Sequence, residues 1–315
     1  MKRDVFFMLF GLTEDERSPK GLFLLLGVFI GSAIVGAILS PFLYGLVAML
    51  ANGASRDQSF WGYLLDHEFP DFFDRARMLA VVFALIWLMR YCKLWSWSAL
   101  GFRSAHLKYL PKWFIYGVLM IVLAAGAQWL VGNPILSDRA TPGKVVEKIL
   151  IMTLSGLFLA IIEESIFRGM VFRIFYTWCN QYLAVIFASL FFAYVHFKHV
   201  PWVGQDTHSI LDGFHVAWLT LLSPFYTFDF FPFVNLFLAG LILNMIFLRT
   251  KSLWCCVGMH AGWVALKVPY GKFVHMGDGF PVFWWGTHNV IDGVVPVIML
   301  LVVLLLVTKA KRLEA

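Results

Sequence analysis

Long apolar runs dominate the sequence. A helix of about 20 residues crosses a hydrocarbon core of ~30 Å, and several runs approach or reach that length. Because lipid offers no partners to backbone N–H and C=O groups, such runs have to be helical, and they are too continuous for barrel strands. The predicted spans are Leu22–Leu46, Met78–Tyr91, Trp113–Val131, Val145 to beyond Ile162, Tyr182–His196, Phe228–Leu248, Leu253–Leu266 and Val290–Thr308. The pattern predicts an all-α, polytopic transmembrane bundle of about eight spans, with a catalytic cavity inside it.

Two segments depart from the span pattern. The apolar stretch Ile210–Phe225 is interrupted by Asp212, His215 and Pro224, which is typical of an interfacial or re-entrant segment. The stretch Asn52–Arg77 places aromatic residues between acidic ones. It is predicted to be an amphipathic loop at the membrane surface.

Composition and charge agree with a membrane protein. The chain is 60% hydrophobic and 14% charged, whereas soluble proteins are about half apolar and about a quarter charged. The net charge of +6 comes from Lys and Arg between the apolar runs, which indicates contact with membrane lipid rather than nucleic acid. With the N-terminus inside, most of the 25 basic residues fall on the cytoplasmic side. Both termini are therefore predicted to be cytoplasmic, in a bacterial inner membrane.

Ionisable residues within membrane helices usually mark function, and the sharpest group is Glu163, Glu164 and Arg168. Neighbouring helix positions diverge by about 100°, so the two carboxylates face different ways. Glu164 and Arg168 are four residues apart, in the favourable order for a helical ion pair. This pairing leaves Glu163 free to project elsewhere. The alternative is an ordinary charged helix end at the interface.

Two histidines are the next candidates. Phe192 and His196 share one helix face, and His260 lies in a short apolar helix between Gly258 and Gly262. Small residues at this spacing permit close helix packing. Taken singly, each histidine has an ordinary structural interpretation.

The spacing along the chain predicts that Glu163 and His196 meet. Glu163 lies 17 residues before Asn180, and His196 lies 16 residues after it. If the chain turns near Asn180, a rise of ~1.5 Å per residue places both side chains about 25 Å from the turn. An antiparallel hairpin then brings carboxylate and imidazole side by side, and His260 joins them from a third helix.

This trio suits hydrolysis of a peptide bond inside the membrane. Such a reaction needs water, a base that activates it and a donor for the oxyanion. Glu163 is the candidate base, His196 would orient the same water, and His260 would donate to the oxyanion. No cofactor is required by this chemistry. The same three residues also form a possible zinc set, although the usual HExxH spacing is absent.

Together these motifs resemble the CAAX protease and bacteriocin-processing (CPBP) family of intramembrane endopeptidases. The family pattern is EExxxR, then FxxxH, then HxxxN on a later helix. Residues 163–168 match the first motif, Phe192 and His196 match the second, and His260 begins the third. The resemblance covers about Val145 to Val268. It implies a glutamate-type protease, with a metalloprotease as the alternative, acting on a membrane-embedded or lipid-anchored protein or peptide.

One position departs from the family pattern. The Asn expected four residues after His260 is Val264, which cannot donate a hydrogen bond. Either another group supplies the oxyanion donor or activity is reduced or lost. Asn244, an isolated polar residue in an apolar run, is the candidate substitute.

The predicted organisation has three parts: N-terminal helices with the amphipathic loop (1–144), the catalytic core (145–268), and an outer loop with the last span (269–315). A proton-coupled transporter also uses buried Glu and His, but no repeated halves are evident. An inactive membrane scaffold or immunity protein is the other alternative, favoured by Val264. The remaining polar residues are assigned to loops or interfaces: His199, Asp206, His208, Asp212, His215, His275, Asp278 and His288.

Overall fold

The computed structural model describes residues 16–55, 59–91, 94–132, 134–196, 208–226, 228–290 and 292–309. Apart from one pair of short strands, the regular structure of these residues is helical, which confirms the all-α prediction. Cys92, His199, Asp206 and the charged residues of both chain ends (Lys2, Arg3, Lys311 and Arg312) lie outside the described residues.

The chain folds into two compact units. Unit 1 contains residues 1–18, 93–196 and 229–315, and unit 2 contains residues 19–92 and 197–228. These boundaries follow packing, whereas the predicted parts 1–144, 145–268 and 269–315 follow the motifs. That functional division stays a prediction.

Unit 2 is built from α2 (Lys20–Ala51), α3 (Phe60–Leu65), α4 (Phe69–Tyr91) and α10 (Ile210–Tyr226). Its core contains Phe69 and Phe73, which pack with small side chains of α2 and α10. These two phenylalanines belong to the predicted surface loop, but they are buried, because the second half of that segment is the first turns of α4. The segment with Asp212 is one continuous helix, in which Asp212 accepts hydrogen bonds from Ser209 at the helix start.

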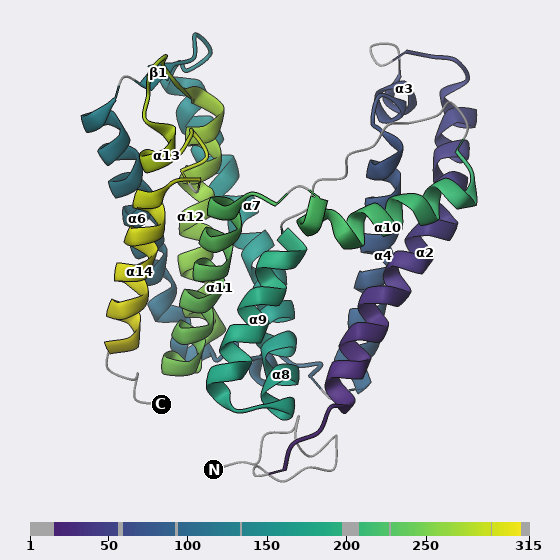
Figure 1. Ribbon diagram of the computed structural model, residues 1–315, viewed down its shortest axis with the longest axis horizontal. Coiled ribbons are helices and arrows are strands. Elements are labelled where there is room, and N and C mark those ends of the chain that lie inside the picture. The colour runs from purple at the N-terminus through teal and green to yellow at the C-terminus, as the bar shows by residue number, and fades with distance from the viewer. Residues whose placement is uncertain are drawn as a thin grey trace. The chain divides into compact units, whose positions relative to one another are not determined.

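Unit 1 contains the helices that carry the motifs. They are α6 (Leu110–Val131), α7 (Pro142–Ile166), η2 (Phe167–Val171), α8 (Phe172–Trp178), α9 (Gln181–His196), α11 (Phe230–Thr250), α12 (Leu253–Phe273) and α14 (Val294–Lys309). The chain turns between α8 and α9 as predicted, where the Asn180 side chain accepts hydrogen bonds from the Tyr182 and Leu183 amides. α12 packs against α6 and α7, and α11 packs against α9 and α14 (Figure 1).

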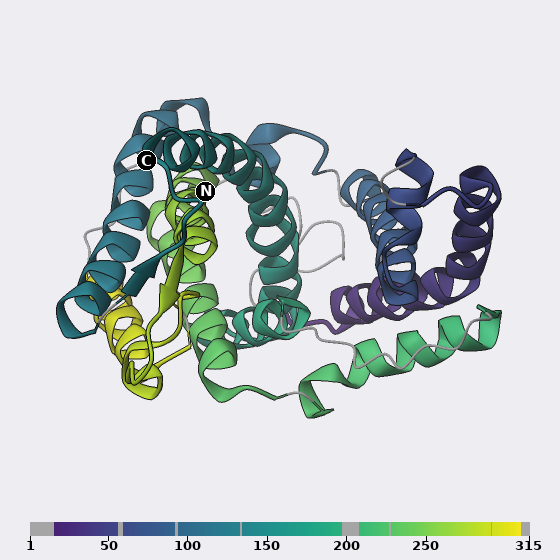
Figure 2. The same ribbon diagram turned by 90° about the horizontal axis from the view of Figure 1, so that it is seen from above.

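A small β-ribbon joins the ends of α6 and α12. β1 (Pro134–Leu136) pairs antiparallel with β2 (Val274–Met276), so that Ile135 lies opposite His275 (Figure 2). Nearby, the Gln128 amide nitrogen donates to the carbonyls of Trp285 and Thr287, while its oxygen accepts from Tyr270. These bonds fasten the segment around α13 (Val282–Trp285) to α6 and α12. In Figure 1 this ribbon lies at one end of unit 1 and the α8–α9 turn at the other.

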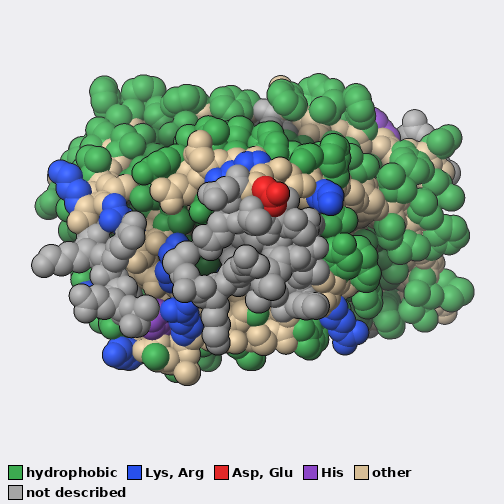
Figure 3. Space-filling model, turned by 90° about the horizontal axis from the view of Figure 1, so that it is seen from below, with side chains coloured by type: hydrophobic (Ala, Val, Ile, Leu, Met, Phe, Trp, Pro, Cys, Tyr) green, Lys and Arg blue, Asp and Glu red, His purple; other side chains and the backbone are tan. Residues whose placement is uncertain are grey.

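The outer surfaces of the helices suit a hydrocarbon environment. Among the residues that the structure describes, four helical segments are long and apolar enough to cross a membrane: Lys20–Ala51, Ser104–Val131, Pro142–Trp178 and Phe230–Thr250. Shorter apolar helices accompany them, so the total of about eight spans stays a prediction. Large apolar side chains such as Leu123, Leu154 and Phe158 are mostly exposed. Figure 3 shows a face on which Lys and Arg side chains lie, with hydrophobic side chains along its upper edge.

Glycines bring α12 against α6. A Cβ atom on Gly258 would lie 2.5 Å from the Leu110 carbonyl oxygen, and one on Gly262 would lie 2.3 Å from the Phe114 oxygen. Small residues at this spacing allow two helix backbones to approach closely in lipid. His260 lies between these glycines, so its position depends on this helix contact.

We expect Gly262→Ala to destabilise the protein because the new methyl group would meet backbone rather than a movable side chain. Overpacking of this kind costs about 1–3 kcal/mol. The change in melting temperature in detergent measures the effect. Gly126→Ala is the control, since a Cβ at Gly126 in α6 meets nothing within 4 Å. Equal melting temperatures for the two variants would contradict the close packing of α6 and α12.

Candidate functional site

The structure brings Glu163 and His196 together, as the hairpin geometry predicted. Oε2 of Glu163 lies 3.3 Å from Nε2 of His196, and the two residues come from α7 and α9. The imidazole of His260 on α12 lies on the same side, with its Nε2 3.8 Å from the same carboxylate oxygen. Three helices of unit 1 therefore place a carboxylate and two imidazoles within a few ångströms.

The hydrogen bonds of His196 fix the position of one proton. Its Nδ1 lies 2.8 Å from the backbone oxygen of Phe192, and a carbonyl oxygen only accepts hydrogen bonds. Nδ1 is therefore the protonated nitrogen. The contact between Nε2 and Glu163 then needs a proton of its own, carried either by the carboxyl group or by the imidazole. The pair is arranged to share a proton.

Glu164 points away from Glu163, into a fully buried network. Its Oε1 accepts from Nη1 of Arg168 at 3.0 Å and from Nδ1 of His260 at 2.9 Å. The side chains of Glu164 and Arg168 are both 0% exposed. The predicted ion pair therefore exists, and it also orients His260 so that Nε2 faces Glu163.

Arg168 extends this network to two further helices. Its Nη2 donates to the Gly240 carbonyl of α11 at 3.3 Å, and its guanidinium carbon lies 4.8 Å from the centre of the Phe192 ring of α9. Such a cation–π contact compensates part of the cost of removing the charge from water. The Phe192 ring also lies 4.2 Å from the ring of His196, centre to centre. One buried cation thereby supports both histidines.

Arg168 lies in a π-helical turn that the sequence did not reveal. In η2 the Phe172 amide donates to the Phe167 carbonyl, five residues earlier. Single π-helical turns inside α-helices occur often at functional sites. All five residues of η2 are buried, so this wider turn is held entirely by packing.

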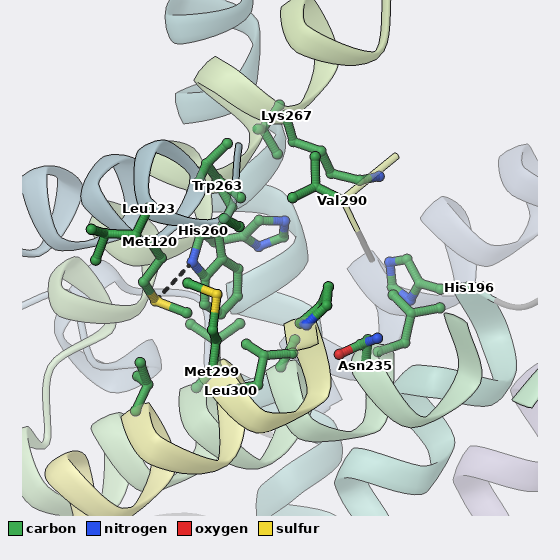
Figure 4. Close-up of a pocket in the computed structure, with 18 of the residues that line it drawn as sticks. Met120, Leu123, His196, Asn235, His260, Trp263, Lys267, Val290, Met299 and Leu300 are labelled. Atoms are coloured by element: carbon green, nitrogen blue, oxygen red, sulfur yellow. Dashed lines mark hydrogen bonds between the residues drawn. The ribbon is translucent and has the colours of Figure 1, made fainter. Parts of the chain in front are cut away.

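Beside the cluster lies a cavity of about 590 Å³ with mostly apolar walls. Glu163 lines this cavity. His196 and His260 line it too, together with apolar residues of α6, α11, α12 and α14 (Figure 4). Cavities of ~300–1,000 Å³ are usual for small-molecule and cofactor ligands. The apolar residues that α6 and α14 contribute to the cavity wall lie outside the predicted catalytic core. No local sequence motif in these two helices indicates that they line a cavity.

The structure separates the two residues considered for the oxyanion side. Val264 lines the cavity, one turn beyond His260. Asn244 does not line it: its amide nitrogen donates to Ser189 Oγ at 2.9 Å, between α11 and α9. Sequence reasoning missed two polar residues that do line the cavity, Asn235 and Lys267 (Figure 4). Both lie in apolar runs, which is the signal that drew attention to Asn244 instead.

The histidine and carboxylate positions also bear on the zinc alternative. Within the described ranges, no group of three or more His, Cys, Asp or Glu side chains is arranged to hold a metal ion. Nδ1 of both histidines is engaged by an acceptor, which leaves Nε2 of each facing Glu163.

The fold and the cluster define an integral membrane protein with a buried Glu–Arg–His network beside an apolar cavity. Residues 145–266 match the family described as "Type II CAAX prenyl endopeptidase Rce1-like", so this segment is similar to that family. The match confirms the resemblance inferred from the three motifs and contains all of their residues. No curated protein and no solved structure matches the chain.

We expect Arg168→Met to destabilise the protein strongly, because it leaves the Glu164 carboxylate buried without its cation. Breaking a buried ion pair costs about 3–5 kcal/mol. Thermal or denaturant unfolding in detergent measures the loss. Arg75→Met is the control, since Arg75 and Asp71 form a half-exposed pair 3.7 Å apart, and such pairs contribute only about 0–1 kcal/mol. Similar losses in both variants would contradict a structural role for the Glu164–Arg168 pair.

Proposed function

We propose that this protein is an intramembrane endopeptidase that hydrolyses a peptide bond near the C-terminus of prenylated, membrane-tethered proteins. The observation that carries the proposal is the meeting of Glu163, His196 and His260 at an apolar cavity. The similarity to the Rce1-like family supports the same class of substrate, since that family is described by its action on the CAAX prenyl motif. This motif ends in a chain terminus and carries its lipid on cysteine.

In the proposed reaction, Glu163 takes a proton from a water molecule as the water oxygen attacks the scissile carbonyl carbon. Nε2 of His196 and Oε2 of Glu163 lie 3.3 Å apart, close enough for one water molecule to contact both. The Glu163–His196 pair then holds the proton and delivers it to the leaving amine nitrogen as the C–N bond breaks. General acid–base catalysis of this kind contributes ~10²–10⁴-fold.

His260 lies on the other side of the reacting carbonyl in this proposal. Its Nδ1 is bound to the buried Glu164 carboxylate, so Nε2 is turned towards Glu163 and the cavity. A protonated Nε2 stabilises the negative charge that develops on the carbonyl oxygen.

The cavity supplies the environment for a lipidated substrate. Its walls are mostly apolar, and they include side chains such as Met120, Leu123, Met299 and Leu300 (Figure 4). Burial of an isoprenoid chain against such walls is favourable. The low dielectric of the cavity also strengthens the electrostatic interactions at the reacting carbonyl. We place both chain ends of the protein in the cytoplasm, the compartment in which lipid-anchored substrates present their termini.

We expect Glu163→Gln to abolish cleavage of a farnesylated CAAX peptide by the purified protein, with a loss of at least about 100-fold, because an amide cannot accept the water proton. The appearance of the released peptide, followed by mass spectrometry, measures the activity. Glu147→Gln is the control: Glu147 lies on the same helix but does not line the cavity. Full activity of Glu163→Gln would refute the proposed base.

The same assay separates the alternatives. Loss of wild-type activity on dialysis against a chelator, with recovery on adding Zn²⁺, would make the enzyme a metalloprotease. Absence of any Glu163-dependent cleavage in a folded protein would favour an inactive scaffold or a carrier. Uptake of a solute driven by a proton gradient would then identify the carrier.

We expect Val264→Asn to raise kcat by about tenfold. Val264 lies one turn after His260 on the cavity wall, where an amide would add a second donor to the oxyanion. Removal of one such donor elsewhere costs ~10²–10³ in kcat, and an added donor that is not fixed by its neighbours recovers less. Val264→Leu is the control, because Leu has the shape of Asn without a donor. Equal kcat values for the two variants would place the oxyanion beyond reach of position 264.

A further inference from the structure

Lys267 is a basic side chain in the wall of a mostly apolar cavity. It lies on α12 seven residues after His260, so the two side chains share one helix face two turns apart. At a rise of ~1.5 Å per residue the separation along the axis is about 10 Å. Figure 4 shows the Lys267 side chain extending into the cavity past Val290.

The surroundings of Lys267 leave its charge available to a ligand. In the part of the chain that the structure describes, Lys267 forms no hydrogen bond and no ion pair. Asp292 attracts it electrostatically, but the Asp292 carboxylate already accepts from the backbone amide and hydroxyl of Thr287. Holding an ammonium group among apolar side chains is costly, and intramembrane charges usually contact a functional partner.

We propose that Lys267 binds the free C-terminal carboxylate of the substrate and so sets how far from the chain end the peptide is cut. This inference rests on the proposed endopeptidase function. An extended chain spans ~3.3–3.6 Å per residue, so three residues cover about 10 Å. That length equals the separation of His260 and Lys267 along α12. This agreement in length is the reason for assigning the terminal carboxylate to Lys267.

The direction of the substrate follows from the same spacing. The carbonyl under attack lies at Glu163 and His260, and the leaving peptide runs along α12, past Val264, to Lys267. A peptide that continues beyond this length cannot place a carboxylate at Lys267, and an amidated end has no charge to offer. Lys267 is a specificity residue in this scheme, since it contacts the end of the substrate rather than the reacting atoms.

The test compares three farnesylated peptides that share one CAAX sequence: the free acid, the C-terminal amide, and the free acid extended by two residues. For the wild type we expect kcat/KM to be about 10- to 100-fold higher for the free acid, the range expected for a hydrogen bond between charged groups. In Lys267→Met this preference disappears, because kcat/KM for the free acid falls to about the value for the amide. Lys267→Arg keeps the preference. Lys272→Met matches the wild type, because Lys272 is an exposed residue of the same helix.

Binding provides an arm that does not depend on turnover. In the Glu163→Gln background, Kd for the free acid and the amide should differ by about tenfold or more, and Lys267→Met should remove the difference. Equal binding and cleavage of acid and amide by the wild type would overturn the proposal while leaving the endopeptidase function intact. A preference that survives in Lys267→Met would overturn it too. Absence of Glu163-dependent cleavage of all three peptides would refute the proposed function instead.

A lipid phosphate offers Lys267 the same chemistry, an anion for an ammonium. Inhibition of free-acid cleavage by anionic lipid, relieved in Lys267→Met and accompanied by equal affinity for acid and amide, would assign the site to lipid. Competition by a short free-acid peptide, but not by its amide, would assign it to the substrate.

Discussion

Glu164 and Arg168 form an ion pair whose side chains are both fully buried, and the geometry of the site follows from it. Removing a pair of charges from water is costly, and further hydrogen bonds offset part of that cost. Here the carboxylate also accepts from His260, and the guanidinium donates to Gly240 and lies over Phe192. The pair therefore couples α7, α9, α11 and α12. Helices that slide or rotate in lipid at little cost are thereby fixed in register.

Much of this arrangement follows from helix geometry alone, which is why the sequence could predict it. The spacing of Glu164 and Arg168 requires them to meet, and the equal distances of Glu163 and His196 from Asn180 place them at one depth. The glycines beside His260 allow α12 to approach α6. Each inference uses only the pitch and rise of one helix or one hairpin, quantities that tertiary packing scarcely alters.

Other features depend on contacts between helices that are remote in sequence. Asn244 and Asn235 look alike in the sequence, since each is a polar residue in an apolar run. Packing turns Asn244 towards Ser189 and Asn235 towards the cavity. The π-helical turn of η2 has no sequence signature, because it is set by the fit of five buried residues to their neighbours. The burial of Phe69 and Phe73 likewise depends on α2 and α10, which the local aromatic pattern could not show.

The adjacent residues Glu163 and Glu164 occupy different environments. Because neighbouring helical side chains diverge by about 100°, one position cannot serve both the scaffold and the cavity. The Glu164 carboxylate accepts hydrogen bonds from Arg168 and His260. Glu163 instead lines the cavity. In the proposed mechanism, loss of either carboxylate removes activity for a different reason. Without Glu163 the folded site lacks its proposed base, whereas without Glu164 the Nδ1 of His260 loses its acceptor. Stability and activity therefore have to be measured on the same variants, since only their combination assigns a residue to chemistry or to support.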